Sequence, residues 1–273
     1  MSWSLNDIRW DDFDRSKVRP ELIRIAKAAC LVEHNGGEYG AYLCSVFRDD
    51  AAFCEAARTW AREEDQHGQA LRRWVEMADP TFDFETAFAR FTAKIKLPTG
   101  ADRSVRGSRT AELISRCVVE VGTSSYYSAL HDGTEEPVFR DICQRIAADE
   151  FRHYKLFYDH MKRYRDRERP FLLQRLWAAF SRLQEAEDDE LAYAYYCGNA
   201  FREPYRRRKF MRAYKRTAFA YYRAAHLERG ALMVLKAAGL KPQSWYGRLL
   251  TRALRALYRQ RGGDGAMPQA AAA

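Results

Sequence analysis

The sequence contains the same short motif twice. Only two of its six histidines follow a glutamate by three residues, in Glu64-Asp-Gln-His67 and in Glu150-Phe-Arg-His153. Residues three apart lie on one face of an α-helix, so each motif predicts a helix that presents a carboxylate and an imidazole together. The two motifs therefore constrain two long segments of the chain to be helical.

Each motif is paired with an earlier glutamate at nearly the same distance. Glu33 lies 31 residues before Glu64, Glu120 lies 30 residues before Glu150, and both earlier glutamates interrupt apolar segments. In an antiparallel helical hairpin, residues equally far from the turn lie at the same height. Turns near residues 49 and 135 are about 15 residues from each glutamate, which at ~1.5 Å per residue places all four at matching depth. Glu38 misses this depth by about one helical turn.

Apolar and polar residues recur at the helical period along the chain, and no convincing strand pattern appears. Pro20 and the pair Asp49-Asp50 are typical helix starts, and a break is expected at residues 131–133. Helices are predicted at 20–47, 50–78, 84–95, 108–130, 136–165, 171–187, 189–202, 205–238 and 244–261. The expected organisation is an N-terminal segment (1–19), a four-helix bundle (20–165), a basic helical extension (166–261) and a disordered tail (262–273).

The repeated layout predicts a metal site. Carboxylates and imidazoles at one level of a bundle are costly to bury unless a cation lies between them, and two divalent irons would supply that charge. A glutamate from each of two helices and a Glu-x-x-His motif from each of two others is the ligand pattern of ferritin-like di-iron proteins. We therefore expect an all-α, ferritin-like four-helix bundle with a long crossover and additional C-terminal helices. The expected iron ligands are Glu33, Glu64, His67, Glu120, Glu150 and His153.

The segments around the two motifs resemble those of a known enzyme family. Trp60-Ala-Arg-Glu-Glu-Asp-Gln-His-Gly68 is similar to the W-x-x-E-E-N-R-H-G of acyl-acyl-carrier-protein desaturases, and Ile146-Ala-Ala-Asp-Glu-Phe-Arg-His153 is similar to their I-A-A-D-E-K-R-H. The resemblance covers about residues 33–165. It implies a di-iron oxidoreductase that desaturates a carrier-bound fatty acyl chain with O2 as co-substrate and two electrons from an external donor of the ferredoxin type.

The resemblance also implies roles for residues beside the ligands. Glu63 and Asp149 would be carboxylates that orient the histidines, and Trp60 would pack beside the cluster. Glu120-Val-Gly-Thr123 is similar to the family's E-R-A-T, so Thr123 is a candidate for proton delivery. A threonine in a helix also commonly donates to the carbonyl of the preceding turn, which is the alternative interpretation of Thr123.

Composition suggests a cytoplasmic protein. No segment has the length and apolarity of a membrane span, and no secretory leader is recognisable. The six cysteines lie singly in apolar helical stretches without a C-x-x-C pair, and we expect buried free thiols.

Charge is unevenly distributed along the chain, and its distribution indicates what kind of binding partner the protein could have. Residues 1–160 contain 22 Lys and Arg against 27 Asp and Glu, whereas residues 199–262 contain 17 against 2. Arg206-Arg-Arg-Lys209 begins a cationic segment with interleaved aromatic residues. Three partners fit it, namely an acidic acyl carrier protein, tRNA, or an anionic membrane surface, and a solvated face without a partner is the fourth interpretation. His226 in this segment is expected to be a surface or core histidine.

Several functions stay open at this stage. A di-iron hydroxylase acting on tRNA or a small molecule is the main alternative, followed by an iron-binding ferritin-like protein without enzymatic activity. Arylamine N-oxygenases place a histidine one turn before the fourth glutamate, where this chain has Ile146, so that class is disfavoured. A homodimer is compatible with the sequence.

Overall fold

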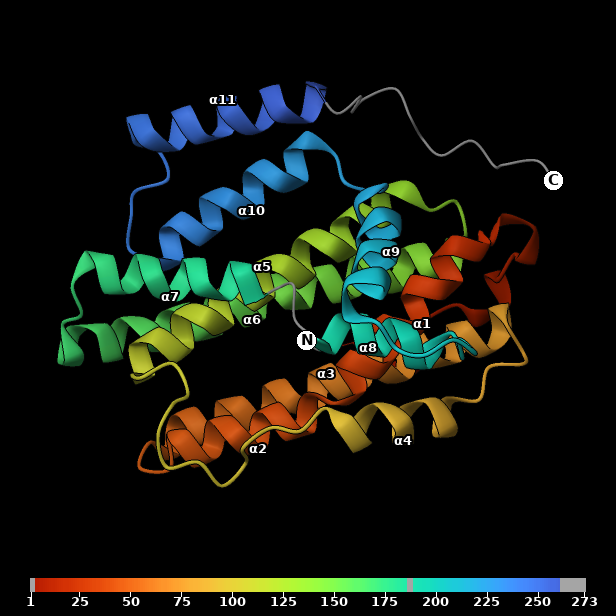
Figure 1. The fold of residues 1–273 in the computed structure, drawn as a ribbon, viewed down its shortest axis with the longest axis horizontal. Helices are drawn as coiled ribbons and strands as arrows, with labels where there is room; N and C mark the ends of the chain where they lie inside the picture. The colour runs from red at the N-terminus through yellow and green to blue at the C-terminus, as the bar shows by residue number, and fades with distance from the viewer. Residues whose placement is uncertain (1–2, 186–188, 261–273) are drawn as a thin grey trace. The chain divides into compact units, whose positions relative to one another are not determined.

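The computed structural model describes residues 3–185 and 189–260 (Figure 1). These residues form helices and connections, with no strand among them, which confirms the all-α class. No helix in this described part is both long and apolar enough to cross a membrane. Three 3-10 turns, at Leu5–Asp7, Trp10–Asp12 and Arg15–Lys17, precede α1 (Pro20–His34), α2 (Gly36–Val46), α3 (Ala51–Ala78), α4 (Phe84–Lys94), α5 (Arg109–Gly133), α6 (Pro137–Glu168), α7 (Leu172–Glu185), α8 (Asp189–Gly198), α9 (Arg207–Phe219), α10 (Ala224–Ala237) and α11 (Trp245–Gln260).

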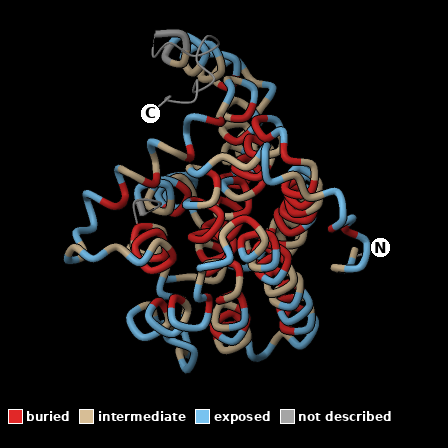
Figure 2. The backbone as a smooth tube through the Cα atoms, turned by 90° about the vertical axis from the view of Figure 1, so that its right-hand side faces the viewer, coloured by how far each residue is buried: buried red, intermediate tan, exposed pale blue. Residues whose placement is uncertain are grey.

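The chain divides into two compact units. The first takes the described residues of 1–105, 134–145 and 185–217, and the second takes those of 106–133, 146–184 and 218–273. Long helices bury one side and expose the other in both units, as the alternation of red and pale blue along the backbone shows (Figure 2). The helical period of apolar residues in the sequence therefore corresponds to the buried faces.

In the first unit, α1 and α2 pack along α3, and α8 packs on α1 and α4. The hairpin turn lies where the sequence predicts it. Asp50 caps α3 by accepting a hydrogen bond from the backbone N–H of Phe53 at 3.0 Å, which satisfies one of the free donors at the helix start.

The predicted single helix over 20–47 is wrong, because the chain breaks at Asn35 into α1 and α2. Gly36 begins the second of these helices next to α3. A Cβ atom at Gly36 would lie 2.5 Å from Cβ of Glu64, so only glycine allows this approach. Close packing of α2 against α3 thus coincides with the interruption of the helix.

In the second unit, α5 packs beside α10, and α10 packs beside α11.

The break expected at residues 131–133 is wrong, since α5 continues to Gly133 and the connection to α6 follows at 134–136. Glu136 explains the later start of α6. Its buried carboxylate accepts hydrogen bonds from the backbone N–H groups of Val138 and Phe139, at 3.3 and 2.7 Å, and so caps that helix.

The predicted helix over 205–238 is also wrong, because the chain forms α9 and α10 with a connection at residues 220–223. Tyr221 in this connection is buried and packs against Gly133, where an added Cβ would lie 2.5 Å from the Tyr221 ring. Burying this ring offsets the loss of helical hydrogen bonds. Helix α8 ends at Gly198 rather than at residue 202, and the predicted end of α11 at residue 261 and the disordered tail (262–273) lie outside the described residues.

Candidate metal centre

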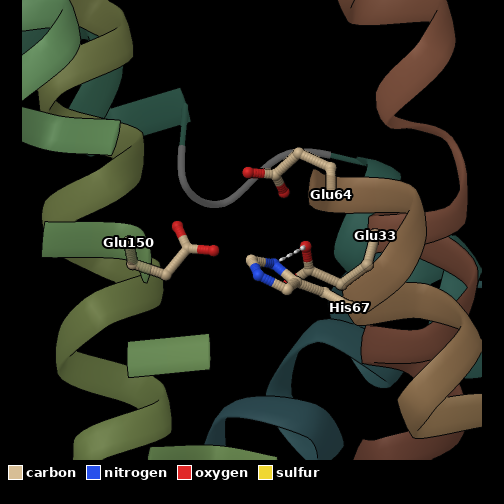
Figure 3. Close-up of side chains that lie close together, drawn as sticks. All are labelled: Glu33, Glu64, His67 and Glu150. Atoms are coloured by element: carbon tan, nitrogen blue, oxygen red, sulfur yellow. Dashed lines mark ion pairs between the residues drawn. The ribbon is translucent and has the colours of Figure 1, made fainter. Parts of the chain in front are cut away.

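In the first unit, three of the predicted ligands lie together. Glu33 comes from α1, and Glu64 and His67 come from α3. Each offers a ligand atom, and these atoms lie within 4.8 Å of one another. His67 Nδ1 is 3.9 Å from Glu33 Oε2, the ion pair that is dashed in Figure 3. All three side chains are buried, so we call Glu33, Glu64 and His67 the first half-site.

The surroundings of the first half-site include a residue that the sequence interpretation missed. The Trp3 ring stacks on the His67 imidazole, with ring centroids 6.0 Å apart and planes inclined by 7°. The two residues are 64 positions apart, and Trp3 lies in a segment without helical periodicity, so no sequence pattern predicts this contact. Trp3 shields one face of the imidazole and limits its rotation.

In the second unit, the other three predicted ligands lie together in the same way. Glu120 comes from α5, and Glu150 and His153 come from α6. Their ligand atoms lie within 4.8 Å of one another, and His153 Nδ1 is 3.8 Å from Glu120 Oε2 and 3.9 Å from Glu150 Oε1. These residues are at most 1% exposed. We call Glu120, Glu150 and His153 the second half-site.

Thr123 lies within hydrogen-bonding distance of the second half-site. Its hydroxyl Oγ1 is 2.5 Å from Glu150 Oε2 and 3.3 Å from the carbonyl oxygens of both Val119 and Glu120. A hydroxyl has one proton to donate, and the shortest of these contacts is to the carboxylate. The carbonyls of the helical back-bonding alternative and the predicted ligand are both within reach of the hydroxyl, and the shorter distance favours donation to Glu150.

The remaining predicted residues lie close in sequence to the half-sites. Trp60 and Asp149 are buried, and Glu63 is half-buried. The Asp149 carboxylate accepts a hydrogen bond from Arg152 Nη2 at 2.5 Å. The predicted role of Glu63 and Asp149 in orienting the histidines, and of Trp60 in packing beside the cluster, stays a prediction.

The environment of both half-sites has low polarity. Cys30 and Cys117 lie one helical turn before Glu33 and Glu120, and burial raises the pKa of both thiols well above the usual range. Neither cysteine belongs to the clusters of potential ligand atoms found among the described residues. All six cysteines are free, and five are buried as predicted, whereas Cys44 is only half-buried.

Each half-site has the donor set of a metal centre. Two buried carboxylates beside one imidazole leave an excess of negative charge in a medium that stabilises charge poorly, and a divalent cation removes that excess. Carboxylate oxygens and imidazole nitrogens suit iron among the divalent metals. The residues present thus fit one iron ion in each half-site.

The cationic segment predicted from the sequence forms a groove in the first unit. It has a volume of about 730 Å³. Its lining is Arg206, Arg207, Arg208, Lys209, Arg212, Ala213 and Arg216. His226, by contrast, is a core histidine of the second unit, with Nδ1 accepting from the Arg223 N–H and Nε2 lying 3.1 Å from Asp132 Oδ2.

Two pairs of helices each present a buried Glu, Glu and His, which makes this a helical protein with two clusters of potential metal ligands. Residues 44–170 match the family model described as fatty acid desaturase. The matched range contains all the predicted ligands except Glu33, which precedes it. No curated protein matches the chain. The matched family is one of oxidoreductases, and the buried Glu and His clusters are compatible with a metal at the half-sites.

Proposed function

We propose that the chain is a cytoplasmic, O2-dependent di-iron oxidoreductase that desaturates a fatty acyl chain bound to an acyl carrier protein. The first half-site would hold one iron and the second half-site the other, in a single di-iron centre. The observation that carries this proposal is the repetition of a buried Glu, Glu and His on two pairs of helices within a chain that resembles fatty acid desaturases. Equal depth of the four glutamates in the two sequence hairpins supports the pairing of the half-sites.

The reaction has a definite balance. Two C–H bonds of the acyl chain break and a C=C bond forms, while O2 takes up two electrons from the substrate and two from a donor of the ferredoxin type. Two protons from solvent and the two substrate hydrogens complete two water molecules. The iron pair supplies the chemistry that activates O2 and removes hydrogen from an unactivated carbon.

The protein side chains have separate tasks in this proposal. Buried apolar surroundings of the half-sites exclude water, which keeps a reactive oxidant from being consumed by solvent. Glu150 accepts a hydrogen bond from the Thr123 hydroxyl, which supports Thr123 as the residue that would pass a proton. Trp3 keeps the His67 ring in a fixed orientation.

A direct test supplies the iron-loaded protein with O2, reduced ferredoxin and a panel of acyl carrier protein substrates, and weighs the products. We expect a product lighter by two hydrogens. A product that gains one atom from labelled O2, without an alkene, would support the alternative hydroxylase. Iron oxidation without any organic product would support the non-enzymatic iron-binding alternative.

The ligand assignment has a separate test that does not require activity. Glu64→Ala and His153→Ala should each lose most of the bound iron, because a lost ligand leaves an open position that lowers affinity. Glu38→Ala is the matched control, since Glu38 lies on α2 away from the predicted depth, and should keep about two irons per chain. Full iron content in both ligand variants would contradict the assignment.

The basic groove supports the carrier part of the proposal. Acyl carrier proteins are acidic, and a groove with six cationic side chains attracts an acidic partner over distances of about one Debye length. The phosphate backbone of tRNA would be attracted by the same charges, which is why a tRNA hydroxylase remains the second candidate.

A further inference from the structure

One face of α7 exposes large apolar side chains. Leu173, Trp177 and Phe180 are 78%, 66% and 51% exposed, and Phe171, just before the helix, is 79% exposed. Spacings of four and three residues place the first three on a single helix face. Single exposed apolar residues are common on protein surfaces, whereas a continuous line that contains a tryptophan and a phenylalanine indicates a contact surface.

The opposite face of α7 is fixed to the second unit. Ala178 and Ala179 are buried, and Arg175 lies against Gly239, where an added Cβ would clash with its guanidinium. Helix α7 is therefore anchored in its unit by one face. The line formed by Leu173, Trp177 and Phe180 points away from the core to which α7 is anchored.

The chain before this apolar line is positively charged. Residues 162–182 contain seven Lys and Arg against two Asp and Glu, and the next acidic residue is Glu185 at the end of α7. Helix α11 of the same unit repeats the combination, because Trp245 and Leu249 are 70% and 58% exposed on a helix that contains four arginines and no acidic residue. Exposed tryptophan and leucine next to arginines is the composition of helices that lie in the interface of an anionic membrane.

We propose that α7 binds the surface of an anionic lipid bilayer. Leu173, Trp177 and Phe180 would enter the boundary between headgroups and acyl chains. The exposed arginines before α7, Arg163, Arg167 and Arg169, would bind lipid phosphates. Charge favours lipid over a second copy of the chain, since two faces that each carry an excess of cations repel one another, whereas an anionic surface attracts both the charges and the apolar line.

This inference goes beyond the proposed function and does not depend on it. The apolar line belongs to the second unit, whereas the groove proposed for the acyl carrier protein belongs to α9 and is lined by arginines. Loss of lipid binding should therefore leave iron content and carrier docking unchanged. Activity on a free acyl carrier substrate should likewise be the same in the presence and absence of vesicles.

The test measures flotation of the purified full chain with lipid vesicles. We expect binding to vesicles of phosphatidylcholine with phosphatidylglycerol, weak binding to pure phosphatidylcholine, and a decrease as salt is raised. The triple variant Leu173→Ser, Trp177→Ser, Phe180→Ser should lower partitioning by at least about tenfold, because each side chain loses apolar area that the bilayer covers.

Phe219→Ser is the matched control. Phe219 lies outside α7 but in the same unit and is 53% exposed. The Phe219→Ser protein should therefore bind vesicles as well as the parent chain does. Equal thermal melting of all three proteins would show that the substitutions act on the surface. Vesicle binding by the triple variant equal to that of the parent would overturn the proposal. A second outcome would also overturn it. If the parent chain does not bind anionic vesicles but forms a dimer, and the triple variant is a monomer, then α7 is an interface between copies.

Discussion

At the scale of single residues, the contact between Thr123 and Glu150 joins a hydroxyl to a predicted iron ligand. A hydrogen bond to an ionised carboxylate is stronger than one to a carbonyl, and it fixes the side chain that accepts it. Thr123 therefore has a positioning role toward Glu150 in addition to its candidate role in proton delivery. Both roles predict that its loss changes how O2 is used rather than how much iron is bound.

The variant Thr123→Val should keep iron near the parent level and should consume more reducing equivalents per alkene formed. Valine preserves the shape of threonine but has no hydroxyl to donate to Glu150. The measurement is the ratio of donor oxidised to product, together with iron content. Ser128→Ala removes another α5 hydroxyl, which donates to the Ser124 carbonyl at 2.7 Å, and should leave the ratio unchanged. An unchanged ratio in Thr123→Val would exclude the proposed role.

Asp79, at the end of α3, makes the stability of the fold depend on pH. Burial would raise its pKa, but hydrogen bonds from Lys27 and Thr81 outweigh burial and lower the pKa from 3.8 to about 2. A carboxyl whose pKa is lower in the folded chain contributes stability above its unfolded pKa and loses this contribution as pH falls through the folded value. The Asp79 contribution is therefore complete above about pH 4 and disappears near pH 2.

We expect Asp79→Asn to lower the free energy of unfolding by about 1–2 kcal/mol at pH 7, after allowance for partial solvent screening, and by little near pH 2. Denaturant unfolding at the two pH values measures this difference. Asp102→Asn, which changes an exposed aspartate in a connection, should have a small effect at both. An equal loss for Asp79→Asn at both pH values would show that packing, rather than charge, is responsible.

At the scale of elements, the first half-site depends on how closely α2 approaches α3. The break at Asn35 follows Glu33 by two residues, and Gly36 lies against the Cβ of Glu64. Helix placement and ligand placement are therefore linked by one residue that has no side chain. A methyl group at this position requires either the helices to separate or Glu64 to move.

Gly36→Ala should destabilise the fold by about 1–3 kcal/mol and reduce iron content, because the new Cβ would lie 2.5 Å from the Glu64 Cβ. Thermal melting and metal analysis measure the two effects. Gly37→Ala is a close control, since an added Cβ there has nothing within 4 Å, and alanine in a helix should stabilise by about 0.5–1 kcal/mol. Similar results for the two variants would contradict the packing argument.

At the scale of the whole molecule, charge is separated along the chain. The acidic excess lies in residues 1–160 and the basic excess in residues 199–262, although the formal net charge is +9. Such a distribution directs an acidic partner to one region rather than to the whole surface. The groove that begins at Arg206 is the place where the first unit concentrates positive charge.

Reversal of Arg206, Arg207 and Arg208 to Glu should raise the KM for an acyl carrier substrate by about tenfold or more at low salt, and by less at high salt, where the parent is itself screened. Iron content should not change. Reversal of Arg248 and Arg252 on α11 tests whether net charge alone accounts for the effect, and should weaken docking less. If the α9 reversals left the kinetics with the acyl carrier substrate unchanged but abolished tRNA binding, the result would favour the second candidate function.

The sequence alone determined the helical class and the two sets of predicted ligands. Both follow from short-range rules, since the helical period of apolar residues and the three-residue spacing in Glu64-x-x-His67 and Glu150-x-x-His153 fix which side chains share a face. The start of α3 was predictable for the same reason, because Asp50 caps its own helix.

Tertiary structure decided the features that depend on contacts distant in sequence. The break before Gly36 reflects its approach to Glu64, and the end of the predicted helix over 205–238 reflects the burial of Tyr221 against Gly133. Trp3 reaches His67 only because the folded chain brings residues 64 positions apart into contact. Local propensity favours helix at many of these positions, but close packing outweighs it, and packing partners cannot be identified from the period of a single segment.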